Sequence, residues 1–114
     1  MENNSAHNVD NVRPLSVDFD LHTDGDMDFK KELAGLMIDD IWELNHAQHD
    51  SQETFYKACH KIKATLEILN DKDLNEVISQ LRSPESDIAK QQEAIHMFDT
   101  LCEELVKSLT REAA

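Results

Sequence analysis

Residues that break or turn a polypeptide are scarce here: the 114 residues include two Gly and two Pro. A β-sheet domain needs more turn-forming residues than this, and two glycines cannot build a Walker loop or a dinucleotide-binding fingerprint. Helix-favouring Leu, Ala, Glu, Lys and Gln are abundant instead. The composition therefore predicts a single all-α domain that does not bind ATP by those loops.

Positive charge is also scarce, with 11 Lys and Arg against 24 Asp and Glu, a net charge of −13. Nucleic acids and anionic membranes are poor partners for such a chain, because both require a basic surface. No apolar run approaches the roughly 18 residues of a membrane span, and the N-terminus lacks the features of a signal peptide. We expect a cytoplasmic protein in which Cys59 and Cys102 are buried thiols and form no disulfide.

The N-terminal region differs from the rest of the chain. Residues 1–13 are polar and rich in Asn, which predicts a disordered tail. Residues 14–114 form the predicted domain, and its first segment, 14–25, contains the alternating sequence VDFDL. This alternation predicts a short extended segment or irregular strap across the domain.

Four amphipathic helices are predicted after the strap. The first begins near residue 26 and its pattern frays at 46–50, and the others run at about 51–69, 71–81 and from 84 or 85 to 109. Asp26 and Ser51 are plausible N-caps, and Asn70 suits a left-handed stop. Short links between such helices predict an antiparallel up-down four-helix bundle. The apolar positions expected to face its core are Phe29, Leu33, Leu36, Met37, Leu44, Phe55, Cys59, Ile62, Leu66, Leu69, Leu74, Val77, Ile78, Leu81, Ile88, Ile95, Phe98, Leu101, Cys102, Leu105 and Leu109.

His60 lies on the solvent side of the second predicted helix, about 140° from the centre of its apolar stripe at 100° per residue. Lys63, Ala64 and Glu67 follow at i+3, i+4 and i+7, and Tyr56 precedes at i−4. A neutral exposed imidazole is a usable nucleophile, and a lysine one turn away can neutralise phosphoryl oxygens on its ring. A small residue at the next position lets a second protein approach closely.

Residues 58–65, ACHKIKAT, resemble the His-x-x-Lys-Gly-Ser/Ala signature of histidine phosphotransfer (HPt) domains. The helix stop at Asn70, the helix that follows it and the amphipathic helix after Gly25-Asp26 are similar to the same family. The resemblance covers about residues 24–110. Ala64 departs from the signature, because the family usually has Gly there, and the added methyl should weaken or reshape partner docking without blocking it.

This resemblance implies a phosphorelay carrier. His60 would accept a phosphoryl group from the aspartate of a response-regulator receiver domain and pass it to another receiver aspartate, and Lys63 would stabilise the group. The implied partners are receiver domains and a hybrid histidine kinase. The receiver would supply Mg²⁺ and most catalytic groups, so this chain would be a monomeric carrier without a cofactor and not an enzyme.

A docking surface is expected around His60, formed by Tyr56, Ala64 and Glu67 together with apolar residues of the first helix. In an antiparallel pair turning near residue 48, residue 37 lies opposite residue 60, so Met37, Ile38 and Ile41 are expected to flank the histidine, and Ile38 and Ile41 to take part in docking. Trp42 shares the second apolar stripe of that helix, and we expect the strap to cover it.

Two other functions remain open: a non-phosphorylated helical interaction module, in which His60 is incidental, and the dimerisation and phosphoacceptor element of a histidine kinase. The second lacks its usual acidic residue after the histidine, since Lys61 is there. A calcium loop at 20–31 is improbable because Lys31 occupies the bidentate Glu position. His46 and His49 have metal-ligand spacing without a third ligand, so no metal site is predicted.

Overall fold

The computed structural model describes residues 13–15, 17–83 and 87–113, and these residues form helices without any strand. The predicted all-α class is therefore confirmed. The proposed disordered tail lies outside the described residues except for Arg13. The six helices of the described residues are α2 (Val17–Thr23), α3 (Met27–Asp50), α4 (Gln52–Lys61), α5 (Lys63–Leu69), α6 (Lys72–Arg82) and α7 (Ile88–Ala113).

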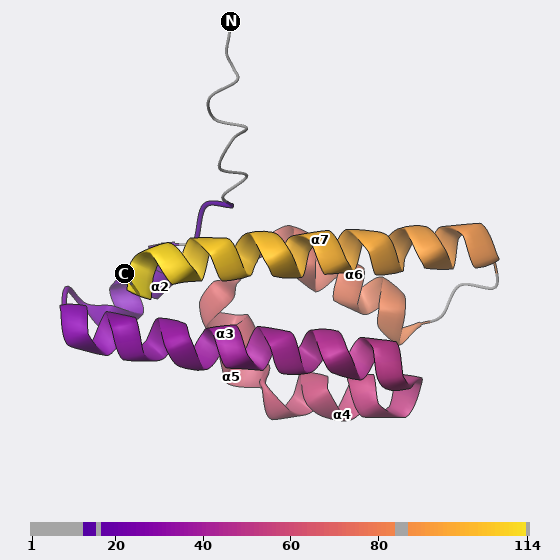
Figure 1. Cartoon of the computed structure of the whole chain (residues 1–114), viewed down its shortest axis with the longest axis horizontal. Coiled ribbons are helices and arrows are strands. Elements are labelled where there is room, and N and C mark those ends of the chain that lie inside the picture. Colours follow the sequence, from indigo (N-terminus) through magenta and orange to yellow (C-terminus); the bar gives the residue numbers. More distant parts are fainter. Residues whose placement is uncertain (1–12, 16, 84–86, 114) are drawn as a thin grey trace, which may run out of the picture.

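The two longest helices among the described residues, α3 and α7, lie side by side and run in opposite directions (Figure 1), and they share the most extensive contact between any two of these helices. The α4 helix packs on α3, and α6 packs on α7 and also touches α4. The short α2 helix packs on α5 and α3. The α4 and α6 helices are therefore neighbours, which determines the surroundings of His60.

Local sequence signals set most helix ends. The predicted N-caps Asp26 and Ser51 accept hydrogen bonds of 3.0 Å from backbone N–H groups of the first turn, and Asp71 caps α6 in the same way at 2.9 Å. Asn70 adopts the predicted left-handed conformation, with φ 44° and ψ 44°. The predicted helix start at 84 or 85 lies outside the described residues, and Asp87 accepts a bond from the Ala89 N–H at 2.9 Å just before α7.

The predicted strap is wrong in its conformation, because residues 17–23 form the helix α2. Phe19 and Thr23, four residues apart, are both buried, whereas Leu21 is exposed. The four-residue spacing of these buried side chains is that of a helix. The alternation of apolar and acidic residues, which suggested an extended segment, does not determine the conformation here. Asp24 and Gly25 then take positive φ values of 46° and 77° in the turn to α3, where glycine meets no steric penalty.

The predicted second helix, 51–69, is two helices, α4 and α5, separated at Ile62. Ile62 has φ −102° and ψ 24°, outside the usual helical range. Its side chain is buried all the same, so the joint is fixed in the core. With α2, this break gives six helices in the described part of the chain, in place of the expected four.

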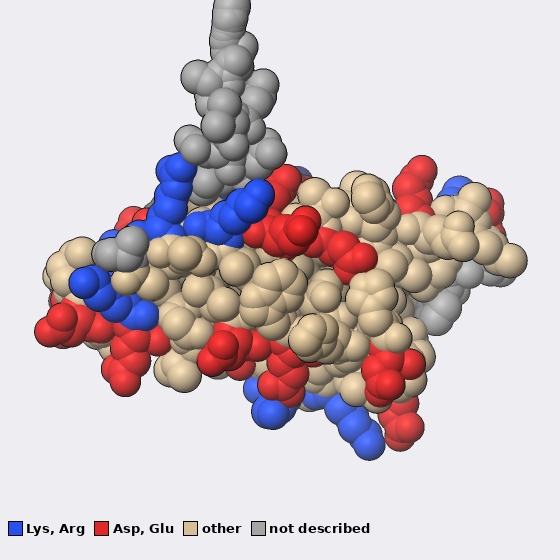
Figure 2. Space-filling model, in the orientation of Figure 1, with Lys and Arg blue, Asp and Glu red and all other residues tan. Residues whose placement is uncertain are grey.

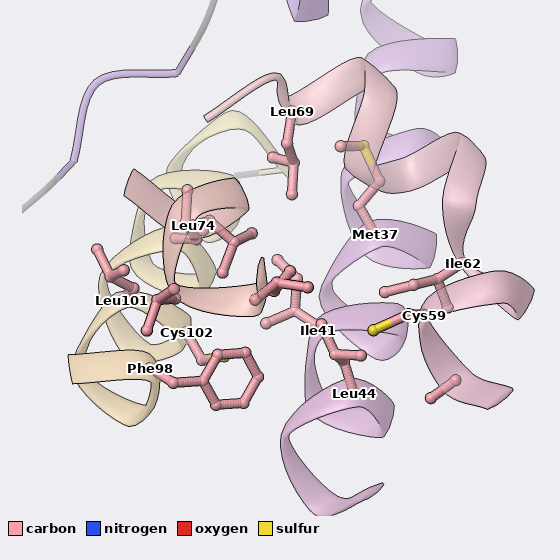
Figure 3. Packing of buried hydrophobic residues seen from close by; sticks show 14 of the residues in the cluster. Met37, Ile41, Leu44, Cys59, Ile62, Leu69, Leu74, Phe98, Leu101 and Cys102 are labelled. Carbon is pink, nitrogen blue, oxygen red and sulfur yellow. The ribbon is translucent and has the colours of Figure 1, made fainter. Parts of the chain in front are cut away.

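The core contains most of the predicted apolar positions, and side chains from several helices meet in it (Figure 3). Three predicted positions are wrong, since Phe29, Leu36 and Ile88 are exposed. The buried face of α3 is rotated away from Phe29 and Leu36 because α3 packs between α7 and α4. The buried residues of α3 are Ala34, Met37, Ile41, Leu44 and Ala47.

Figure 2 shows acidic side chains along the lower side of the face that α3 and α7 form, acidic and basic side chains together along its upper side, and mostly uncharged side chains between them. Basic side chains occur along the lower edge of that view, where Figure 1 places α4. Within the described ranges, no helix combines the length and apolar character needed to cross a membrane.

Candidate functional site

His60 lies in the last turn of α4, two residues before the break at Ile62, and its side chain is exposed. Its ring meets that of Tyr56 edge to face, with the ring centroids 4.7 Å apart and the planes at 76°. This geometry is favourable for aromatic rings. Tyr56 therefore orients the imidazole while leaving one side of it open to solvent.

The break at Ile62 separates His60 from Lys63, which is the first residue of α5. The Ile62 N–H still donates to the Ala58 carbonyl at 3.0 Å, and the Ile62 carbonyl accepts from the Leu66 N–H at 3.1 Å. The backbone bonds thus continue through the joint although its dihedral angles change. His60 and Lys63 remain close enough to line the same hollow.

This hollow, of about 370 Å³, lies between the α4–α5 joint and α6. His60 and Lys63 form one wall, and polar side chains of α6 form the opposite wall. Its full lining consists of Cys59, His60, Lys63, Leu66, Asn75, Ile78, Ser79 and Arg82. The neighbour of His60 is therefore α6, and the hollow offers an imidazole, an ammonium and a guanidinium to one small anionic group.

Arg82 is the site residue that sequence reasoning missed. Its guanidinium carbon is 4.8 Å from the centroid of the Tyr56 ring, within cation–π range. It is the last residue of α6, directly after the buried Leu81. In the sequence, Arg82 directly follows the Leu74–Leu81 apolar stripe, which indicates that Arg82 is exposed. The stripe does not show which helix lies beside Arg82.

The expected role of Ile41 is wrong, because its side chain is only 1% exposed and belongs to the core. Ile38 is half-buried against the core, and it lies seven residues before Asn45, whose side chain donates to Asp99 of α7 at 2.8 Å. Residues seven apart share a helix face, so Ile38 is on the α7 side of α3. Neither residue flanks His60.

The side of α4 that meets α3 carries Lys61 and Ala58 instead. Lys61 Nζ is 2.9 Å from Glu43 Oε2 of α3, and Ala58 lines the groove between the two helices. His60 points to the other side of α4, toward α6. The prediction that residue 37 lies opposite residue 60 concerned only their height along the paired helices. It did not specify how α4 is rotated about its own axis.

Trp42 is not covered by the N-terminal segment as expected. It is 36% exposed and lines the groove between α3 and α4, together with Ala58 and Lys57. The α2 helix lies elsewhere, where Leu21 and His22 line a hollow with residues of α5. That difference follows from α2 packing mainly on α5.

Ala64 and Glu67 are exposed as predicted, but α2 bounds the surface on which they lie, since both line the hollow next to Leu21 and His22. Thr65 holds this part of α5 in place, because its hydroxyl donates to Asp40 Oδ2 of α3 at 2.5 Å. A partner that approaches over Ala64 would therefore meet a fixed helix whose outer edge is extended by α2.

The lysines near His60 differ in their ion pairing. Lys57 Nζ is 3.6 Å from Glu53 Oε2, and Lys61 pairs with Glu43. Pairing raises the pKa of Lys61, mainly through the hydrogen bond from its ammonium to Glu43. Among the described residues, no carboxylate lies within ion-pair distance of Lys63, so its charge is available to an anion at His60.

Metal ligands do not gather in the described part of the chain, where no three His, Cys, Asp or Glu side chains are placed to hold an ion. His49 lies in α3, and its Nε2 is 2.8 Å from Asp99 Oδ1. Cys59 and Cys102 are buried free thiols, as predicted. Burial raises the pKa of both, that of Cys102 to about 12.

Comparison with known proteins gave no match: no protein-family model, no curated protein and no solved structure corresponds to this chain. The residues around His60 and their geometry are therefore the basis for assigning a function to this chain.

Proposed function

We propose that this protein is a phosphorelay carrier that accepts a phosphoryl group on His60. The observation that carries the proposal is the exposed imidazole in a hollow also lined by Lys63, a lysine without a carboxylate partner among the described residues. Phosphoryl transfer depends on positioning and charge neutralisation. His60 is the acceptor, and Lys63 neutralises the oxygens of the transferred group.

In the transfer step, the unprotonated ring nitrogen of His60 attacks phosphorus of a receiver's aspartyl phosphate. An N–P bond forms, the aspartyl O–P bond breaks, and the aspartate leaves as a carboxylate. The proton on the other ring nitrogen stays there. The reverse step, with a second receiver, returns the phosphoryl group to an aspartate, so the protein is a carrier and not an enzyme.

The scaffold is compatible with an HPt-like four-helix bundle. Its four members would be α3, the bent pair α4–α5, α6 and α7, with α2 as an addition at one end. The antiparallel α3 and α7 helices and the packing of α4 on α3 and α6 on α7 support this correspondence.

The partners of such a carrier are receiver domains, among them that of a hybrid histidine kinase, in the cytoplasm. Receivers bind Mg²⁺ in an acidic pocket, so the metal comes with the partner and this chain acts as a monomer without a cofactor. The docking surface consists of Tyr56, Ala64 and Glu67, which are exposed four residues before and four and seven residues after His60. Ala64 supplies the small side chain that close approach requires.

The test uses receivers encoded beside this protein's gene, phosphorylated with radiolabelled phosphate and mixed with the purified chain. Wild type should acquire acid-labile, alkali-stable label, and His60→Gln should acquire none. His96→Gln is the matched control, because His96 is exposed on α7, and it should be labelled like wild type. Label that persists in folded His60→Gln would refute the assignment.

A helical interaction module is the second candidate, and the groove between α3 and α4 favours it. The groove is lined by the partly exposed Trp42 ring and by Ala47 and Ala58. In that function His60 is incidental, so His60→Gln would bind the partner as wild type does, and Trp42→Asp would not bind. Phosphorylation of His60 by a receiver would decide against it.

A further inference from the structure

Three side chains from two helices form a continuous stack beside the hollow. The Arg82 guanidinium of α6 lies over the Tyr56 ring at 4.8 Å, and the Tyr56 ring meets the His60 ring at 4.7 Å. Arg82 also lines the hollow that contains His60 and Lys63. Arg82 therefore contacts Tyr56, the aromatic neighbour of His60, and also borders the hollow that His60 faces.

The place of Arg82 is fixed although its side chain is not enclosed. The Gln52 side-chain amide donates to the Leu81 carbonyl at 2.9 Å, which ties the end of α6 to the start of α4. Arg82 itself is exposed, and within the described residues no carboxylate lies at ion-pair distance from it. The guanidinium can thus change its contacts by rotation of its own side chain, without movement of the backbone.

The stack with Tyr56 is a weak contact, because Tyr56 is 47% exposed and water screens the attraction. A phosphoryl group on His60 would offer charged oxygens in the same hollow. Charge-assisted hydrogen bonds from a guanidinium to phosphate oxygens are stronger than a solvent-exposed cation–π contact. The more favourable partner for Arg82 after phosphorylation is therefore the phosphoryl group.

We propose that Arg82 is a second cationic ligand of the phosphoryl group, stacked on Tyr56 while His60 is free and turned to the phosphoryl oxygens once His60 carries them. Lys63 and Arg82 then hold the group from opposite walls of the hollow, one from α5 and the other from α6. This inference rests on the proposed phosphorylation of His60, and it adds α6 to the elements that stabilise the phosphorylated form.

The experiment loads His60 without a receiver, by means of phosphoramidate. The imidazole nitrogen attacks phosphorus, the P–N bond of the reagent breaks and ammonia leaves. The ³¹P NMR resonance that is missing from treated His60→Gln identifies phospho-His60 among other labelled histidines. Its shift is then followed against pH, which reports the pKa of the phosphoryl group.

A nearby cation favours the dianion and so lowers the phosphoryl pKa. Arg82→Gln should therefore raise that pKa by about 0.5–1 unit, and Lys63→Gln should raise it by a similar amount. Lys72→Gln is the matched control, because Lys72 is exposed at the other end of α6, and it should leave the value unchanged. A shift for Arg82→Gln no larger than that control would refute the proposal.

The movement itself is tested by the ring-current shift of the Arg82 Hδ protons. The shift should be present in the unphosphorylated protein, absent from Tyr56→Leu and lost from wild type on phosphorylation. A ring-current shift that survives phosphorylation would mean that Arg82 stays on Tyr56. Failure of phosphoramidate to label His60 in folded protein would also refute the inference, since the hollow would then exclude a phosphoryl group.

The experiments distinguish a failure of the proposed carrier function from a failure of the inference about Arg82. If no receiver labels His60 but the ³¹P titration still responds to Arg82→Gln, the two cations form the anion site while the relay assignment is wrong. If a receiver labels His60 and the titration ignores Arg82, the carrier stands and Lys63 acts without help from α6.

Discussion

Arg13 and Asp71, 58 residues apart in the chain, form a two-pronged ion pair, with Arg13 Nε 2.6 Å from Asp71 Oδ2 and Nη2 3.1 Å from Oδ1. The same guanidinium also contacts Asp73 and approaches Glu104 at 3.6 Å. The Arg13 carbonyl accepts a bond from the Ser108 hydroxyl. The segment before α2 is thereby joined to the N-cap of α6 and to α7.

Replacement of Arg13 should destabilise the fold. Arg13→Ala leaves the partly buried Asp71 carboxylate without its cation and removes the link to α7, and we expect a loss of roughly 1–3 kcal/mol in the free energy of unfolding. Urea unfolding followed by circular dichroism measures it. Lys107→Ala, at an exposed position of α7, is the control and should change the free energy little. An equal midpoint for both variants would show that the ion pair contributes nothing.

The contribution of Arg13 should also depend on pH. Burial alone would raise the pKa of Asp71, but hydrogen bonds from Arg13 and from the Leu74 N–H hold it below its ordinary value of 3.8. A carboxyl with a lowered folded-state pKa stabilises the protein above its unfolded pKa and loses that effect as pH falls through the folded value. The difference in unfolding free energy between wild type and Arg13→Ala should be constant near neutral pH and shrink below about pH 4. A difference that grows in acid would contradict this.

Helix ends were predictable from sequence because their causes are local. Ser51 and Asp26 cap helices through contacts three residues away, and Asn70 takes a left-handed conformation that its own side chain tolerates. The all-α class and most core positions followed from the same short-range periodicity.

The surroundings of His60 were not predictable, because they depend on how helices rotate against each other. In the sequence, Ile41 fits an exposed docking stripe as well as a buried one. Only the packing of α7 on α3 decides between them. Arg82 became a candidate only when α6 was placed beside α4. The break at Ile62 carries no Gly or Pro, so no local signal marks it.

Lys63 should contribute to transfer and little to folding. Lys63→Ala removes one charge-assisted contact to the phosphoryl group, and we expect about 1–3 kcal/mol less transition-state stabilisation, roughly a 5- to 150-fold slower transfer. Rapid-quench kinetics with a phosphorylated receiver measures the rate. Lys57→Ala is the control, because Lys57 lies in the same helix as His60 but lines the groove between α3 and α4 and already pairs with Glu53. Equal rates for Lys63→Ala and wild type would make Lys63 a bystander.

The two thiols should be protected in the folded protein. Burial raises the pKa of Cys102 to about 12, so at pH 8 only about one in 10⁴ of these thiols is ionised even before access is considered. The pKa of Cys59 is also raised by burial, while the charge of Arg82 opposes the rise. Ellman's reagent should react slowly with native protein, at Cys59 first, and rapidly with both in urea. Fast labelling of Cys102 without denaturant would mean that α7 opens readily.

Ala64 should control the approach of the receiver to His60. The side chain is exposed in the first turn of α5, next to the α2 edge formed by Leu21 and His22. In Ala64→Arg a long side chain would occupy the space that a docked partner needs, so binding to an activated receiver should weaken at least tenfold, while the melting temperature stays close to that of wild type. Ala89→Arg makes the same change at an exposed position of α7 and should bind normally. Ala64→Gly removes one methyl from the contact surface and should bind more tightly, although glycine costs a helix up to about 1 kcal/mol. Titration with a receiver held in its active state by a phosphoryl analogue measures all three affinities. Wild-type affinity in Ala64→Arg would place the partner elsewhere, and the groove at Trp42 would then be the surface to test.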